Sequence, residues 1–108
     1  MPGEISAGDL ASRLRKRKAV HLVDVREAWE RAIAKLDDQQ HIPLDELPER
    51  MKEVKPPAGA QLVLYCHHGV RSLAAAEFLE QQGLKEVLSL RGGIDAWSAQ
   101  VDSSIPAY

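Results

Sequence analysis

Short apolar runs alternate with helical patterns along this chain, and this alternation constrains its fold more than any other feature. Buried strands are predicted at residues 20–25 (VHLVDV), 62–65 (LVLY) and 87–90 (VLSL). Weaker strands are expected near Ile5 and Ile42. With helical spacing between these runs, the sequence predicts an α/β fold, in which about five mostly parallel strands carry helices on both faces.

Helices are expected wherever apolar residues recur three or four positions apart. Ser6 is the predicted cap of the first helix. Asp45 is the predicted cap of a later one, which places Pro48 in a first turn where proline is tolerated. Gly83 supplies a left-handed residue after the helix over about 70–82. The apolar faces expected to pack in the core, both tryptophans included, are Leu10 and Leu14; Trp29, Ile33 and Leu36; Leu44, Leu47, Met51 and Val54; Ala74, Ala75, Phe78 and Leu79; and Ile94, Trp97 and Val101.

Length and charge limit the classes of function. With 108 residues the chain fits one domain, residues 1–108. Its net charge of −2 argues against wholesale binding to nucleic acid or anionic membrane, and the basic run at 13–18 (RLRKRK) is interpreted as a solvated helix end. The sequence has neither an apolar run long enough for a membrane span nor a secretory pattern at its start, so we expect a cytoplasmic protein.

Cys66 is the only cysteine, and its surroundings distinguish it from an ordinary buried thiol. A lone cysteine is most often a small core residue, and it can form neither an internal disulfide nor a multi-cysteine metal site. Here it ends an apolar strand, and six residues from Cys66 to Arg71 lead into a helix. Ligands bind at this end of parallel strands. The helix N-terminus, the charge of Arg71 and a positive φ at Gly69 together predict an anion cradle that stabilises a cysteine thiolate.

The segment CHHGVRS resembles the active-site loop of single-domain rhodanese sulfurtransferases. VHLVDVRE, HIPLDEL and LRGGIDAW resemble further motifs of that family, in the family's order and at compatible spacing, so the resemblance covers most of the chain. It implies a rhodanese-like three-layer fold. It also implies that Cys66 takes sulfane sulfur from thiosulfate or a persulfide donor and passes it to a thiol or cyanide. The resemblance implies no metal or organic cofactor.

The same resemblance assigns roles to the other motif residues. The substrate-binding loop would comprise His67, His68, Gly69, Val70 and Arg71, with Arg71 orienting an anionic donor. Supporting positions would be Asp24 and Arg26, which fix neighbouring loops, together with Ser72, Gly92 and Gly93.

The two histidines of the loop leave alternatives open. His67 and His68 can act directly in catalysis, or they can tune donor affinity as exposed loop residues. A zinc site that combines them with Cys66 is not expected, because adjacent side chains rarely converge on one ion.

The sulfur acceptor must come from outside the chain, because no second cysteine can resolve a Cys66 persulfide. Cyanide, a small thiol, thioredoxin or another sulfur-carrier protein would serve. A phosphatase or arsenate reductase is one alternative, but related enzymes of that kind have a loop one residue longer. The other alternative is a non-catalytic rhodanese-like module that binds a protein partner, and the presence of Cys66 and Arg71 argues against it.

Residues 35–40 (KLDDQQ) depart from the family pattern. Relatives often have a Pro-Gly turn before the strand that ends in Ile-Pro, and this segment contains neither residue. Asp37 and Asp38 add negative charge. We therefore expect the local turn, and with it the preference for a donor or partner, to differ from those of relatives.

Overall fold

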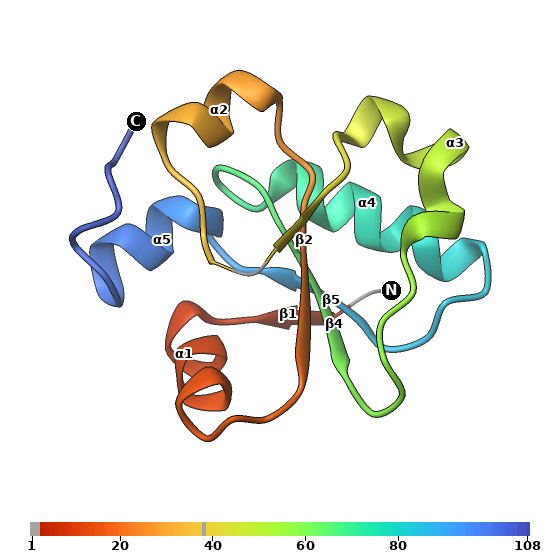
Figure 1. The fold of residues 1–108 in the computed structure, drawn as a ribbon, viewed down its shortest axis with the longest axis horizontal. Coiled ribbons are helices and arrows are strands. Elements are labelled where there is room, and N and C mark those ends of the chain that lie inside the picture. The colour runs from red at the N-terminus through yellow and green to blue at the C-terminus, as the bar shows by residue number, and fades with distance from the viewer. Residues whose placement is uncertain (1–2, 38) are drawn as a thin grey trace.

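Five parallel strands form one sheet in the order β1-β5-β4-β2-β3 (Figure 1). The computed structural model describes residues 3–37 and 39–108. Its strands are β1 (Gly3–Ile5), β2 (Val20–Asp24), β3 (Gln39–His41), β4 (Gln61–Tyr65) and β5 (Val87–Leu90). The α/β fold expected from the alternating pattern is confirmed, and every strand pair is parallel among the described residues.

Helices cover both faces of this sheet (Figure 1). They are α1 (Ala7–Arg15), α2 (Ala28–Ile33), α3 (Leu47–Arg50), α4 (Val70–Gln81) and α5 (Gly93–Gln100), with short 3-10 helices at Leu44–Glu46 and Met51–Glu53. None of the helices in the described ranges is long and apolar enough to cross a membrane. The basic run at 13–18 lies at the exposed end of α1 and in the turn after it.

The alternation of side chains along β4 divides the core into two layers. Val63 and Tyr65 pack with α1 and α5, whereas Leu62, Leu64 and Cys66 pack with α3 and α4. Successive side chains of a strand point to opposite faces, so one buried strand supplies both layers. The side chain of Cys66 therefore faces the α4 layer as it leaves the sheet.

The predicted ends of α1 and α4 are confirmed. The Ser6 side chain accepts a hydrogen bond from the Asp9 amide at 3.1 Å, as a capping residue does. Gly83 has a φ of +104° just after α4. Among the apolar residues predicted to be in the core, Leu10, Ile94 and Trp97 are buried.

The prediction that Trp29 and Ile33 of α2 pack in the core is wrong. Trp29 is 63% exposed and Ile33 is 44% exposed, while Leu36 is buried but lies beyond the end of the helix. The helix has only six residues, and it turns the carboxylate of Glu30 inward instead. Leu14 and Val101, at the ends of α1 and α5, are also more than one third exposed.

The helix predicted with Asp45 as its cap and with Leu47, Met51 and Val54 on its apolar face is broken into three short pieces, and Asp45 is not its cap. Asp45 lies inside the first 3-10 helix, and neither Pro43 nor Glu46 makes a capping hydrogen bond through its side chain. Pro48 does lie in the first turn of α3, as expected. Proline has no amide to donate to the carbonyl of residue 44, so one continuous α-helix from Leu44 is interrupted there.

Candidate active site

The carboxyl ends of β2, β4 and β5 bring the motif residues to one edge of the sheet. β2 leads into Val25 and Arg26, β4 leads into Cys66, and β5 leads into the Gly92-Gly93 turn. In parallel sheets this edge is where ligands bind, because the loops from all strands meet there. Segments far apart in sequence thus converge around one thiol.

Cys66 lies at the centre of a cradle of backbone amides. Its side chain is 1% exposed, and its Sγ accepts hydrogen bonds from the amides of Gly69 at 3.1 Å and Ser72 at 3.3 Å. Gly69 has the expected positive φ, +99°, and immediately precedes α4. The first turn of α4 therefore points its free amides at the sulfur, an arrangement that stabilises negative charge.

A pair of buried hydroxyl groups lies behind the thiol. Ser72 Oγ is 3.5 Å from Cys66 Sγ and 2.7 Å from Ser89 Oγ on β5. Both serines are fully buried. Ser89 was not among the residues predicted from the sequence, although a single polar residue in the apolar run VLSL indicated it.

The N-terminus of α5 holds the backbone of the thiol loop from the other side. The amides of Ile94 and Asp95 donate to the carbonyls of Cys66, at 2.9 Å, and His67, at 3.1 Å. Gly93 has a φ of +61°, and a Cβ at this position would collide with those two carbonyl groups. The Gly92-Gly93 turn is therefore a close backbone contact, which only glycine permits at position 93.

Asp24 and Arg26 form a fully buried ion pair beside the loop. The guanidinium donates to both carboxylate oxygens at 2.9 and 2.8 Å, and also to the carbonyl of Ala34. The Tyr65 hydroxyl donates to Asp24 at 3.0 Å, and burial together with this carboxylate raises the pKa of Tyr65 above its usual value. The pair thus ties the segment after β2 to the end of β4.

A second ion pair, not predicted from the sequence, fixes Arg71. Its two terminal nitrogens donate to the Glu30 carboxylate at 2.6 and 2.7 Å. The hydrogen bonds from Arg71 lower the pKa of Glu30 to about 2, although burial acts in the opposite direction. The charge of Arg71 is therefore compensated within the chain. The only indication of Glu30 in the sequence was its position three residues after Glu27, with which it forms a capping box at the start of α2.

Tyr108 also reaches this site, from the segment after α5. Its ring stacks on His67 with centroids 3.9 Å apart, and His67 stacks in turn on His68 at 3.8 Å. The Tyr108 hydroxyl accepts from Arg26 at 2.8 Å and donates to Glu30 at 2.9 Å. No local pattern in the sequence indicated this contact, because Tyr108 follows the last predicted helix.

The two loop histidines and Asp95 form one cluster of potential metal ligands within the described residues. The two imidazole rings are stacked, at an interplanar angle of 25°. One ligand atom from each histidine and a carboxylate oxygen of Asp95 lie within 4.8 Å of one another. Within the same described ranges, His67 Nε2 is buried without a hydrogen-bond partner.

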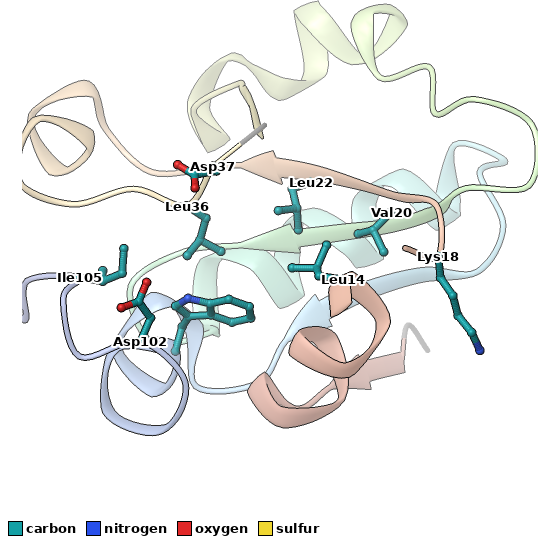
Figure 2. A pocket seen from close by; sticks show the side chains of 9 residues that line it. Leu14, Lys18, Val20, Leu22, Leu36, Asp37, Asp102 and Ile105 are labelled. Atoms are coloured by element: carbon teal, nitrogen blue, oxygen red, sulfur yellow. The ribbon is translucent and has the colours of Figure 1, made fainter. Parts of the chain in front are cut away.

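A cavity of about 410 Å³ lies in the opposite layer of the molecule, away from the thiol loop (Figure 2). Figure 2 shows Leu14, Val20 and Leu22 along it, with Lys18 near one end and Asp102 near the other. Leu36 and Asp37 of the unusual segment 35–40 line it too, while Asp38 lies outside the described residues. The effect of that segment on donor preference stays a prediction.

Comparison with known proteins identifies the family. The model of the rhodanese-like domain matches residues 6–100. The chain belongs to this family. A sulfurtransferase of Allochromatium vinosum is 41% identical over 98 residues, covering 91% of this chain and 90% of the relative. The thiosulfate sulfurtransferase GlpE of Vibrio cholerae is 30% identical over 87 residues, covering 81% and 80%.

A solved structure supports the fold independently. The rhodanese-related protein of Thermoplasma volcanium is 33% identical and superposes with a TM-score of 0.80, covering 92% of this chain and 93% of that one. The rhodanese resemblance noted from the motifs is thereby confirmed, as is the rhodanese-like fold. In its general class, the chain is a rhodanese-type sulfurtransferase.

Proposed function

We propose that the chain transfers sulfane sulfur from thiosulfate or a persulfide donor to an external thiol or cyanide, through a persulfide on Cys66. The observation that carries this proposal is the position of Cys66 Sγ, which receives the amides of Gly69 and Ser72 beside the start of α4. Preorganised amides stabilise negative charge on sulfur without reorganising during the reaction. One relative is a thiosulfate sulfurtransferase, which supports thiosulfate as a donor.

The reaction comprises two displacements at sulfur. The Cys66 thiolate attacks the outer sulfur of thiosulfate, so that an Sγ–S bond forms, the S–S bond of thiosulfate breaks and sulfite leaves with the electron pair. Cyanide or an acceptor thiolate then attacks the carried sulfur. The Sγ–S bond breaks and its electron pair returns to Cys66, which leaves thiocyanate or an acceptor persulfide. The cycle consumes no external oxidant or reductant.

The remaining loop residues are proposed to bind the donor. Gly69 contributes its amide, and Val70 is 77% exposed at the mouth of the loop. Arg71 attracts an anionic donor. Glu30 fixes the position of the Arg71 side chain and partly compensates its charge. His67 and His68 belong to the loop and lie close to Asp95 of α5, and for them a direct role and a tuning role both stay open.

The supporting residues are proposed to hold this loop in place. Each contacts the loop or a segment next to it: Asp24, Arg26, Ser72, Gly92 and Gly93. The acceptor is proposed to come from outside, as cyanide, a small thiol, thioredoxin or another sulfur-carrier protein, because Cys66 is the only cysteine.

Steady-state kinetics tests this function. The rate of thiocyanate formation would be measured while thiosulfate and cyanide are varied together, for the wild type and Cys66→Ser. A double-displacement (ping-pong) mechanism predicts parallel double-reciprocal lines for the wild type and no transfer by the variant. Transfer by Cys66→Ser at the wild-type rate would refute the mechanism.

The same preparation distinguishes the alternatives. Hydrolysis of a phenyl phosphate that depends on Cys66, without any sulfur transfer, would assign the site to oxyanion chemistry. Inactivity with thiosulfate, with persulfide donors and with the phosphate ester would favour the non-catalytic binding module.

A further inference from the structure

Tyr108 contacts the thiol loop although it lies outside the part of the chain that the family model matches. That match ends at residue 100. The segment that follows returns to the site and brings an aromatic ring against His67, the residue next to Cys66. The contact is therefore made by a residue beyond the part of the chain that the family model matches.

The returning segment is held by specific contacts. Asp102 accepts hydrogen bonds from the amide and hydroxyl of Ser104, at 3.0 and 2.6 Å. The Ile105 carbonyl accepts from the Ser98 hydroxyl on α5 at 2.6 Å, and the Ile105 side chain packs against the core layer of α1 and α5. These contacts fix the direction in which the chain approaches the site.

Tyr108 is connected to both ends of the thiol loop. At the start of the loop its ring lies flat on His67, with an interplanar angle of 6°. At the end of the loop its hydroxyl donates to Glu30, which holds Arg71. Its ring also forms a T-shaped contact with the ring of Trp29, at a centroid separation of 6.4 Å. The ring is therefore fixed against the start of the loop at His67, and its hydroxyl is linked to the end of the loop through Glu30.

We propose that Tyr108 is a specificity-determining residue that narrows the approach to Cys66 and selects small sulfur donors and acceptors over bulky thiols. The inference rests on the proposed function, and it names the size class of the substrates. The thiol is 1% exposed, so an attacking group must enter the loop to reach the carried sulfur. Cyanide and thiosulfate can enter beside a fixed ring. In a peptide or protein thiol, the groups next to the sulfur would collide with the Tyr108 ring before the sulfur reaches Cys66.

The test compares acceptors of different size on the sulfur-loaded protein. Loading from thiosulfate is verified by intact mass. The values of kcat/KM for cyanide and for reduced glutathione are then measured in the wild type, Tyr108→Ala and Tyr108→Phe. We expect Tyr108→Ala to raise the glutathione-to-cyanide ratio by at least about tenfold, a change of about 1.4 kcal/mol in relative barrier. Tyr108→Phe keeps the ring, so its ratio should stay within about twofold of the wild type.

Each other outcome overturns the inference. An unchanged ratio in Tyr108→Ala would show that the ring does not select by size. An equal rise in Tyr108→Phe would assign selection to the hydroxyl network instead. Should Tyr108→Ala fold poorly, Tyr108→Leu keeps an apolar contact with less bulk and should show the same direction of change. A wild type that cannot be loaded with sulfur would refute the proposed function itself, whereas normal loading with unchanged ratios would refute only this inference.

Discussion

Replacing Gly93 by alanine should disrupt the contact between α5 and the thiol loop. The left-handed φ of +61° costs a non-glycine residue roughly 1 to 2 kcal/mol. The added Cβ also collides with the carbonyls of Cys66 and His67, which accept hydrogen bonds from Ile94 and Asp95. Losing both bonds costs about 2 kcal/mol at about 1 kcal/mol each. We therefore expect Gly93→Ala to lower the free energy of unfolding by about 3 to 4 kcal/mol.

Gly59→Ala is the matched control for this experiment. Gly59 has a φ of +82°, and no atom lies within 4 Å of the position of its Cβ. This variant should incur only the backbone cost, roughly 1 to 2 kcal/mol in urea unfolding, and keep its sulfur-transfer rate. Gly93→Ala should lose at least about 100-fold in rate, because a displacement of about 1 Å at a reacting group is enough for such a loss. Equal stability and equal rates in the two variants would refute the idea that α5 holds the loop.

Two further predictions concern the ion pairs. Asp24→Asn leaves the fully buried Arg26 without its counter-charge, so we expect a loss of about 3 to 5 kcal/mol in urea unfolding; a loss below about 1 kcal/mol would contradict the buried-pair account. The pKa of Glu30 is lowered to about 2 from its ordinary 4.5, so its contribution to stability is complete above about pH 4.5 and is lost as the pH falls toward about 2. The difference in melting temperature between the wild type and Glu30→Gln should therefore shrink as the pH is lowered through that range, and a constant difference would argue against the pair.

The geometry around Cys66 was predictable because this segment is continuous in sequence. An apolar strand, Cys66, Gly69 and the start of a helix follow one another directly, and backbone geometry alone brings their amides to the sulfur. The fold was predictable for a similar reason. Strand and helix periods alternate clearly, and parallel strands require that alternation.

Three contacts around the loop were not predicted, because the residues that make them come from distant segments. Glu30, Ser89 and Tyr108 reach the site from α2, β5 and the segment after α5. The error at α2 has the same origin. Apolar spacing favoured Trp29 and Ile33 as core residues, whereas the ion pair with Arg71 turns Glu30 inward and leaves both of them exposed. Periodicity measures local preference and carries no information about such a partner.

The central claim is that Cys66 carries the transferred sulfur. It is tested most directly by incubating the protein with thiosulfate, removing the excess and recording the intact mass before and after treatment with a reducing thiol. The account predicts a gain of one sulfur atom that maps to Cys66, disappears on reduction and is absent from Cys66→Ala. An unchanged mass with thiosulfate and with persulfide donors, or an equal gain in Cys66→Ala, would contradict it.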